Sequence, residues 1–161
     1  MTVGLLTAVD HRHEADLVAG LEQVPELEVV RRCADAPELL SVAAAGLADV
    51  AIVSAATQFA VQPVAEAFGL GEAYLATQLE IVDGHFTGRV IEPACYGAGK
   101  VLLAGEYARK HGLDLGECYF YSDSHHDLPL LESVGYPVAV NPDARLRRIA
   151  AHRGWPVMHF Y

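Results

Sequence analysis

The sequence predicts an α/β fold with a doubly wound, mainly parallel sheet, helices on both faces and a β-hairpin extension. Short apolar runs alternate with amphipathic segments of helical period along the 161 residues. Some runs, such as 50–53, are apolar throughout, which suits a strand covered on both faces. The pair Asp83-Gly84 separates two strand-like segments and is a strong hairpin signal. With 52% hydrophobic residues, we expect a single domain over residues 1–161.

The first part of the chain predicts three strands, each followed by a helix. The strands are expected at 3–9, 27–33 and 49–54, and the helices near 14–24, 36–45 and 58–68. The second helix has the clearest signals: Asp35 and Glu38 form a capping box, Pro37 lies in the first turn and Gly46 follows the last turn. The third helix is expected to stop at Gly69.

The second part predicts the hairpin and then a return to strand–helix alternation. The expected elements are strands at 77–82 and 86–90, a helix at 99–111, a strand at 117–122, a helix ending near 134, a strand at 137–140, a helix at 144–153 and a strand at 155–160. The helix at 99–111 follows Gly97-Ala98-Gly99 and ends at Gly112. Asp143 is the expected N-cap of the basic helix, which stops at Gly154.

Composition excludes several function classes. A net charge of −10 argues against a general nucleic-acid binder and against binding to anionic membranes. No apolar run is long enough for a membrane span, and no basic leader suggests a secretory signal. The three cysteines, Cys33, Cys95 and Cys118, are too few for a disulfide framework. They suit a reducing compartment, so we expect a cytoplasmic protein.

Polar residues follow several predicted strands at the edge where ligands bind in such sheets. Asp10, Ser54, Asp123 and Asp127 lie there, and Lys100 opens a helix after a glycine-rich turn. Carboxylates with a hydroxyl and a lysine suit a site for Mg²⁺ and phosphate.

Each of these residues also has a purely structural interpretation. Ser122-Asp123-Ser124 is good helix-capping chemistry, and a lysine in a first turn is usually solvated. The glycine-rich turn is not a P-loop, because Ala94 replaces its first glycine and Val101 its hydroxyl residue. We interpret His125 and His126 as solvated or substrate-side residues rather than metal ligands.

From Val53 onward the chain resembles the haloacid dehalogenase-like phosphohydrolases, in the subfamily of phosphoserine phosphatase-like enzymes. The matching motifs are Val53-Ser54-Ala55, Tyr96-Gly97-Ala98-Gly99-Lys100, Tyr121-Ser122-Asp123-Ser124-His125-His126-Asp127, the segment 138–143 and the segment 153–157. The resemblance implies that Ser54, Ala55, Lys100 and Ser124 hold phosphate, that Asp123 binds Mg²⁺ and that Asp127 supports the metal site. The implied reaction is Mg²⁺-dependent hydrolysis of a small phosphorylated metabolite through an aspartyl-phosphate.

The front of the chain departs from this family. The first family motif, Asp-x-Asp-x-Thr, occurs nowhere in the sequence. The nearest candidate is Asp10-His11-Arg12-His13-Glu14, in which Asp10 would be both nucleophile and metal ligand. Arg12 occupies the position of the general acid/base, and a guanidinium cannot fill that role because it stays protonated. We therefore expect low turnover.

The segments 4–10, 14–18 and 29–35 instead resemble the receiver-like amino-terminal part of septum-site-determining proteins related to the MinD/ParA ATPases, a resemblance that covers residues 1–55. The chain then reads as a receiver-like half, 1–55, and a haloacid dehalogenase-like half, 56–161, joined at the strand 49–54. Such a chimera has three possible origins: natural recombination, a gene-model error and deliberate fusion.

Three functions remain open: an active phosphatase, a catalytically impaired or inactive chimeric protein, and a receiver-like regulatory module. The oligomeric state is also open, a dimer included. The two resemblances differ in sheet order, because the segments 27–33 and 117–122 compete for one side of the strand 3–9. If the segment 27–33 takes that side, Asp123 is displaced by at least one strand spacing, about 4.8 Å. Such a displacement would disturb in-line phosphoryl transfer.

Overall fold

The computed structural model of the chain describes residues 3–8, 27–33 and 50–159. It is an α/β fold in which strand pairs are mostly parallel. Strands β1 (Val3–Ala8) and β2 (Leu27–Cys33) pair in parallel along their whole length. These two strands match the predicted ranges closely. The helices predicted at 14–24 and 36–45 lie outside the described residues.

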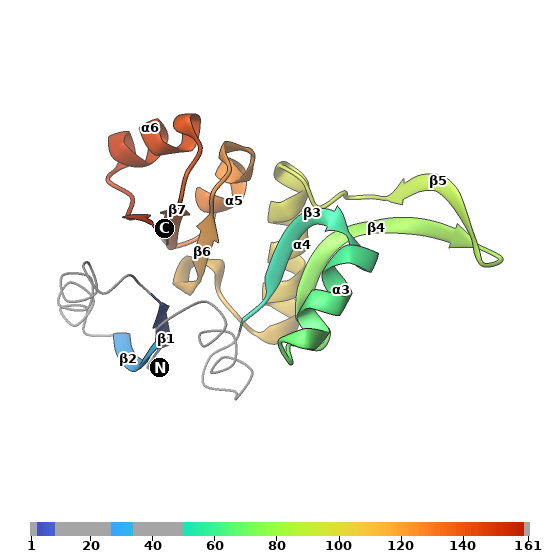
Figure 1. The fold of residues 1–161 in the computed structure, drawn as a ribbon, viewed down its shortest axis with the longest axis horizontal. Helices are drawn as coiled ribbons and strands as arrows, with labels where there is room; N and C mark the ends of the chain where they lie inside the picture. Colours follow the sequence, from blue (N-terminus) through green and yellow to red (C-terminus); the bar gives the residue numbers. More distant parts are fainter. Residues whose placement is uncertain (1–2, 9–26, 34–49, 160–161) are drawn as a thin grey trace.

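The second sheet carries the hairpin. Its elements are β3 (Ile52–Thr57), α3 (Gln58–Ala67), β4 (Tyr74–Val82) and β5 (His85–Ile91), in the strand order β3-β4-β5. β3 and β4 are parallel, whereas β4 and β5 are antiparallel and project from the body of the molecule (Figure 1). At the turn, Asp83 and Gly84 have φ angles of 49° and 77°, as a type I′ turn requires. The predicted hairpin is therefore confirmed.

The third sheet is fully parallel, in the order β6-β7-β8. Its strands and the surrounding helices are α4 (Ala98–His111), η2 (Leu115–Glu117), β6 (Tyr119–Ser122), η3 (His125–Asp127), α5 (Leu128–Leu131), β7 (Tyr136–Val140), α6 (Ala144–Arg153) and β8 (Val157–Met158). Leu131, Ala139, Leu146 and Ala150 are fully buried and form one cluster with the half-buried Phe120 and Trp155. This cluster joins α5, β7 and α6 into one packed unit.

Local signals placed most of these elements correctly. Asp143 is the N-cap of α6, as predicted, and α4 and α6 both end at a glycine in the left-handed conformation, Gly112 and Gly154. β3 begins and ends three residues later than expected, so Ser54 lies within the strand and not, as predicted from the apolar run 50–53, at its end. α5 is shorter than predicted, because the chain after it turns back to pass the η2 backbone. Gly135 makes this approach possible, since a Cβ there would lie 1.8 Å from the carbonyl oxygen of Gly116.

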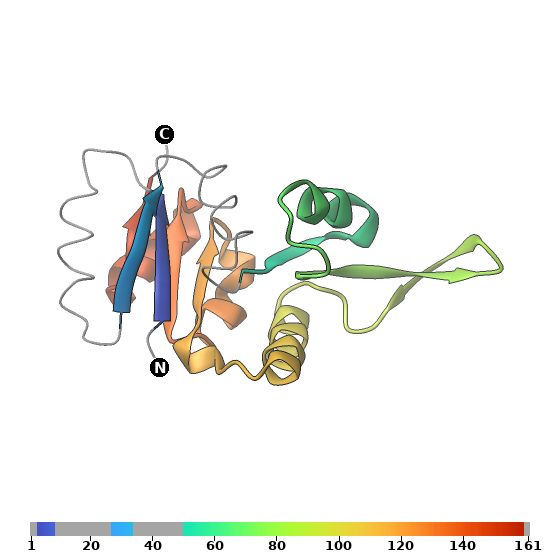
Figure 2. The ribbon, with the colours of Figure 1, turned by 90° about the horizontal axis from the view of Figure 1, so that it is seen from below.

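The hydrogen bonds of the described strands form three sheets rather than one continuous sheet. β1 pairs with β2, so the segment 27–33 is the observed partner of the first strand, while β6 pairs with β7. Helix α4 packs against β4 on one side and against α5 on the other, and so connects the second and third sheets (Figure 2). None of the helices in the described ranges is both long and apolar enough to cross a membrane.

Candidate functional site

An ion pair buried between α4 and η3 lies at the centre of the candidate site. The Lys100 Nζ atom lies 2.6 Å from Asp127 Oδ1, and only 4% of the Lys100 surface is exposed. The other carboxylate oxygen of Asp127 accepts a hydrogen bond of 2.8 Å from the Ser122 hydroxyl, at the end of β6. Lys100 is therefore not solvated, as a lysine in the first turn of a helix usually is. The pair instead places one buried positive charge beside the loop 123–127.

The glycine-rich turn explains how Lys100 reaches this position. Gly97 is the N-cap of α4 and has a φ angle of 52°, which favours glycine. Gly99 passes so close to the preceding loop that a Cβ there would lie 1.9 Å from the carbonyl oxygen of Ala94. Both glycines allow the chain to turn sharply before α4, and Lys100 then lies in the first turn of the helix.

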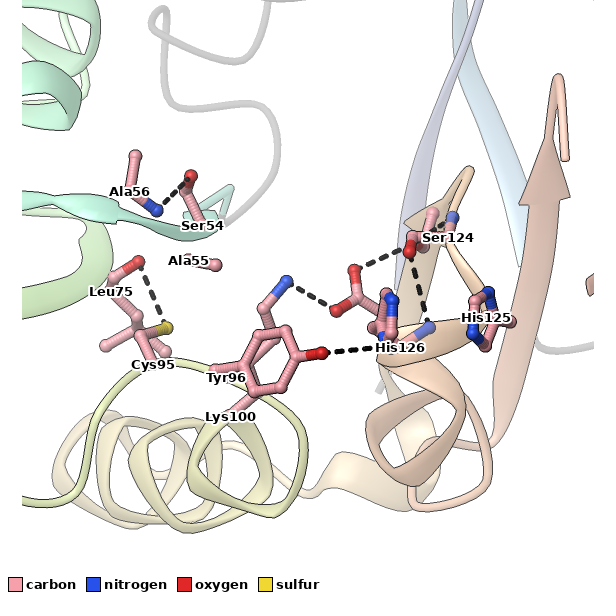
Figure 3. Close-up of polar contacts among 12 residues, drawn as sticks. Ser54, Ala55, Ala56, Leu75, Cys95, Tyr96, Lys100, Ser124, His125 and His126 are labelled. Atoms are coloured by element: carbon pink, nitrogen blue, oxygen red, sulfur yellow. Dashed lines mark hydrogen bonds and ion pairs between the residues drawn. The ribbon is translucent and has the colours of Figure 1, made fainter. Parts of the chain in front are cut away.

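Hydrogen bonds through Thr77 connect β3 to Cys95, in the loop before α4. The Thr77 hydroxyl donates to the Ala55 carbonyl at 3.0 Å, and its oxygen accepts the Cys95 N–H at 3.2 Å. The Cys95 thiol is fully buried and donates to the Leu75 carbonyl. Burial raises the pKa of this thiol, and the Lys100 ammonium and the Ser54 backbone oppose that rise. Ser54 and Lys100 thus both influence the pKa of Cys95, although they make no direct bond with each other (Figure 3).

Asp123 and Ser124 lie in the loop between β6 and η3. The Asp123 side chain is exposed and has no hydrogen bond or ion pair with any other described residue. The Ser124 hydroxyl accepts the His126 N–H and caps η3, so part of the predicted capping chemistry is present. His126 also hydrogen-bonds the Tyr96 hydroxyl through Nδ1 at 2.7 Å (Figure 3). This contact joins the loop before α4 to the loop after β6.

The opposite side of the same loop is attached to α6. Asp143 Oδ2 lies 2.8 Å from both the backbone nitrogen and the ring Nδ1 of His125. Its Oδ1 accepts the N–H groups of Arg145 and Leu146. The His125 and Leu146 N–H groups are the main cause that holds the pKa of the Asp143 carboxyl well below its usual range.

Carboxylate donors fit a hard cation such as Mg²⁺, which is commonly bound by one or two carboxylates together with water and substrate phosphate. Asp127 is already engaged by Lys100 and Ser122, which leaves Asp123 as the carboxylate of this loop that is open to a cation. Residues 50–159 contain no group of three or more side chains suited to hold a metal ion. Asp10 lies outside the described residues. The described residues of this loop thus supply one exposed carboxylate, that of Asp123, which fits Mg²⁺. They do not supply a complete set of ligands.

Sequence reasoning found the two residues of the central ion pair but missed their supports. Of the predicted residues, Lys100 and Asp127 are in direct contact, whereas Ala55 is hydrogen-bonded through Thr77 to Cys95 in the loop before α4. Asp123 makes no direct bond to Ser54 or Lys100 in the described structure. Ser122, Tyr96 and His126 lie within the matching motifs, but no supporting contact was predicted for them. Thr77, Cys95 and the second oxygen of Asp143 were missed altogether, and of these only the N-cap signal of Asp143 offered a clue.

Comparisons with known proteins match most of the chain to one family of hydrolases. The model of the haloacid dehalogenase-like hydrolase family matches residues 5–132. Phosphoserine phosphatase SerB1 of Mycobacterium tuberculosis is 36% identical over 156 residues, which cover 96% of this chain and 50% of that protein. A histidinol-phosphatase of Neisseria meningitidis is 42% identical over 113 residues, which cover 68% of this chain and 50% of that protein. The chain thus spans about half the length of these relatives.

Solved structures support the same fold. A protein of unknown function from Bordetella pertussis has a TM-score of 0.70 at 36% identity, over 91% of this chain and 67% of that one. A phosphoserine phosphatase captured as a phospho-aspartyl intermediate analogue has a TM-score of 0.57 at 24% identity, over 70% of this chain and 54% of that one, and agrees in fold. The resemblance of residues 1–55 to septum-site-determining proteins is not supported, because the family match already begins at residue 5.

Proposed function

Because the chain belongs to the haloacid dehalogenase-like hydrolase family, we propose that it hydrolyses a small phosphate monoester with the help of Mg²⁺. The buried ion pair between Lys100 and Asp127 carries this proposal. A buried ammonium is costly unless it is paired, and here its partner Asp127 belongs to the loop 123–127, which also carries the exposed Asp123. The combination suits a bound phosphate: Lys100 would offset the negative charge of its oxygens, and Asp123 would help to hold the cation.

The residues of the chain take distinct parts in the proposed reaction. Ser54 and Ala55 in β3, together with Ser124, would hold oxygens of the phosphoryl group, and Lys100 would neutralise their charge. Asp123 and Asp10 would bind the cation, while Asp127 holds Lys100 in place. When bound, Mg²⁺ would polarise the phosphoryl group and offset its charge.

The covalent steps follow from a carboxylate nucleophile. A carboxylate oxygen of Asp10 attacks phosphorus as the bond from phosphorus to the ester oxygen breaks. Water then attacks the aspartyl-phosphate, which releases inorganic phosphate and restores the carboxylate. Arg12 cannot donate a proton to the leaving oxygen. Esters whose alcohol leaves readily as an anion are therefore expected to react fastest.

A steady-state assay with p-nitrophenyl phosphate, phosphoserine and histidinol phosphate tests this proposal. The aryl ester is expected to turn over fastest, and the two alkyl esters are the compounds that the names of the relatives suggest. Asp123→Asn should abolish Mg²⁺-dependent turnover. Asp83→Asn is the matched control, because it makes the same change at the exposed hairpin turn, where asparagine is equally favoured.

A catalytically impaired protein is the second candidate, and the absence of Asp-x-Asp-x-Thr from the sequence favours it. Such a protein would bind Mg²⁺ or phosphate without turnover. Equal background rates for the wild type, Asp123→Asn and Asp83→Asn, together with binding of inorganic phosphate that depends on Lys100, would establish this candidate and refute the first.

A further inference from the structure

Asp143 divides its two carboxylate oxygens between two parts of the protein. Oδ1 accepts the N–H groups of Arg145 and Leu146, at 2.8 Å each, and so caps the first turn of α6. Oδ2 lies 2.8 Å from both the backbone nitrogen and the ring Nδ1 of His125. One oxygen therefore serves the helix, and the other serves the loop 123–127.

The backbone of Asp143 makes a second connection to the same loop. Its N–H donates to the Asp123 carbonyl at 2.8 Å. The main chain of the loop is thus held at residue 123 and again at residue 125. Because the Asp123 side chain has no partner among the described residues, its direction depends on how this main chain is held.

Capping alone does not require this arrangement. An N-cap side chain needs one oxygen, as Asp114 shows at η2, where Oδ1 accepts the Gly116 N–H at 2.8 Å. The contacts of Asp143 with His125 go beyond capping. They also link the loop to a fixed base, because α6 is seated in the core by the fully buried Leu146 and Ala150.

We propose that Asp143 is a positioning residue, which holds the loop 123–127 against α6 so that Asp123 is directed toward a bound cation. This inference rests on the proposed function, since it concerns the same Mg²⁺ and phosphate site. Partners outside the set of direct ligands commonly tune metal affinity by fixing the ligands in place.

Two substitutions separate the loop contact from the helix cap. Asp143→Asn keeps one oxygen, which can still cap α6, but it turns a donating amide toward the His125 N–H. Asp143→Ser also supplies a good N-cap oxygen and is too short to reach His125. The matched control is Asp114→Asn, which changes an N-cap aspartate that has no contact with the loop.

The measurements are amide hydrogen exchange of His125 and Leu146, and Mg²⁺ affinity by calorimetry, all on the full chain at neutral pH. In both Asp143 variants we expect His125 exchange to be about tenfold faster, with Leu146 exchange nearly unchanged. The Mg²⁺ dissociation constant should rise about tenfold, and KM at saturating Mg²⁺ should stay close to that of the wild type. Asp114→Asn should match the wild type throughout.

Unchanged His125 exchange and unchanged Mg²⁺ affinity in both Asp143 variants would overturn the inference. Equal acceleration at Leu146 and His125 would also overturn it, because Asp143 would then act only as a helix cap. A wild type that neither binds Mg²⁺ nor hydrolyses phosphate would refute the proposed function instead. In that case the exchange data would still show whether Asp143 fixes the loop.

Discussion

Lys100 Nζ and Asp127 Oδ1 lie 2.6 Å apart in a nearly dry contact, although they belong to different motifs of the sequence. The side chains of the pair are only 6% and 12% exposed. A charge buried in this way is costly when it loses its partner. The contact therefore couples the stability of the fold to the charge balance of the candidate site.

Removal of Lys100 should destabilise the protein strongly. Lys100→Met leaves the Asp127 carboxylate buried and unpaired, so we expect the free energy of unfolding to fall by about 3 kcal/mol. The double variant Lys100→Met/Asp127→Asn should lose less than the sum of the two single changes. Urea denaturation measures all three, and Lys110→Met, at the exposed lysine of α4, is the control. Additive losses would contradict the coupling.

The approach of Gly99 to the loop before α4 leaves no room for a side chain. A Cβ at this position would lie 1.9 Å from a backbone oxygen, so Gly99→Ala should lower the free energy of unfolding by about 2 kcal/mol. It should also disturb the position of Lys100 and reduce activity. Gly105→Ala lies on the same helix, where a Cβ meets nothing within 4 Å, and should stabilise the protein by up to about 1 kcal/mol.

Cys95 should react slowly with thiol reagents. Its thiol is fully buried, and burial raises its pKa, so little of the reactive thiolate forms near neutral pH. The half-buried Cys118 should be alkylated before Cys95. Peptide mass mapping after brief treatment with iodoacetamide measures the order, and urea should remove the difference. Faster labelling of Cys95 in the folded protein would show that this region opens readily.

Tyr119 should weaken the fold at alkaline pH. Burial, followed by the charge of neighbouring Tyr136, raises the pKa of Tyr119 to about 12. The unfolded chain releases this proton near pH 10. The contribution of protonated Tyr119 to the free energy of unfolding is therefore fully present below about pH 10, and it is lost as the pH rises through 12.

The comparison of the wild type with Tyr119→Phe isolates this contribution. The difference between their free energies of unfolding should stay constant below pH 10 and then move in favour of the phenylalanine variant. Urea denaturation at several pH values measures the difference. A difference that stays constant up to pH 12 would rule out the raised pKa. Absorbance titration of the urea-unfolded chain provides the reference for the free tyrosine.

Local signals predicted most strands and helices of the described residues, because these elements depend on neighbouring residues. Asp83-Gly84 fixed the hairpin, and Asp143 and Gly154 marked the two ends of α6. The order of strands in the sheets did not follow from such signals, because β1 pairs with β2 through residues that are far apart in the sequence. In the site, Lys100 and Asp127 were predictable from their motifs. The Thr77–Cys95 link was not, because it joins segments that carry no common pattern.

The burial of Lys100 has a practical consequence for chemical labelling. The sequence contains two lysines, and the second, Lys110, is exposed near the far end of the same helix. Amine-directed dyes and crosslinkers should therefore modify Lys110 and leave Lys100 untouched in the native protein. A fluorophore or surface tether attached through Lys110 would lie at the carboxyl-terminal end of α4, whereas Lys100 of the candidate site lies in the first turn.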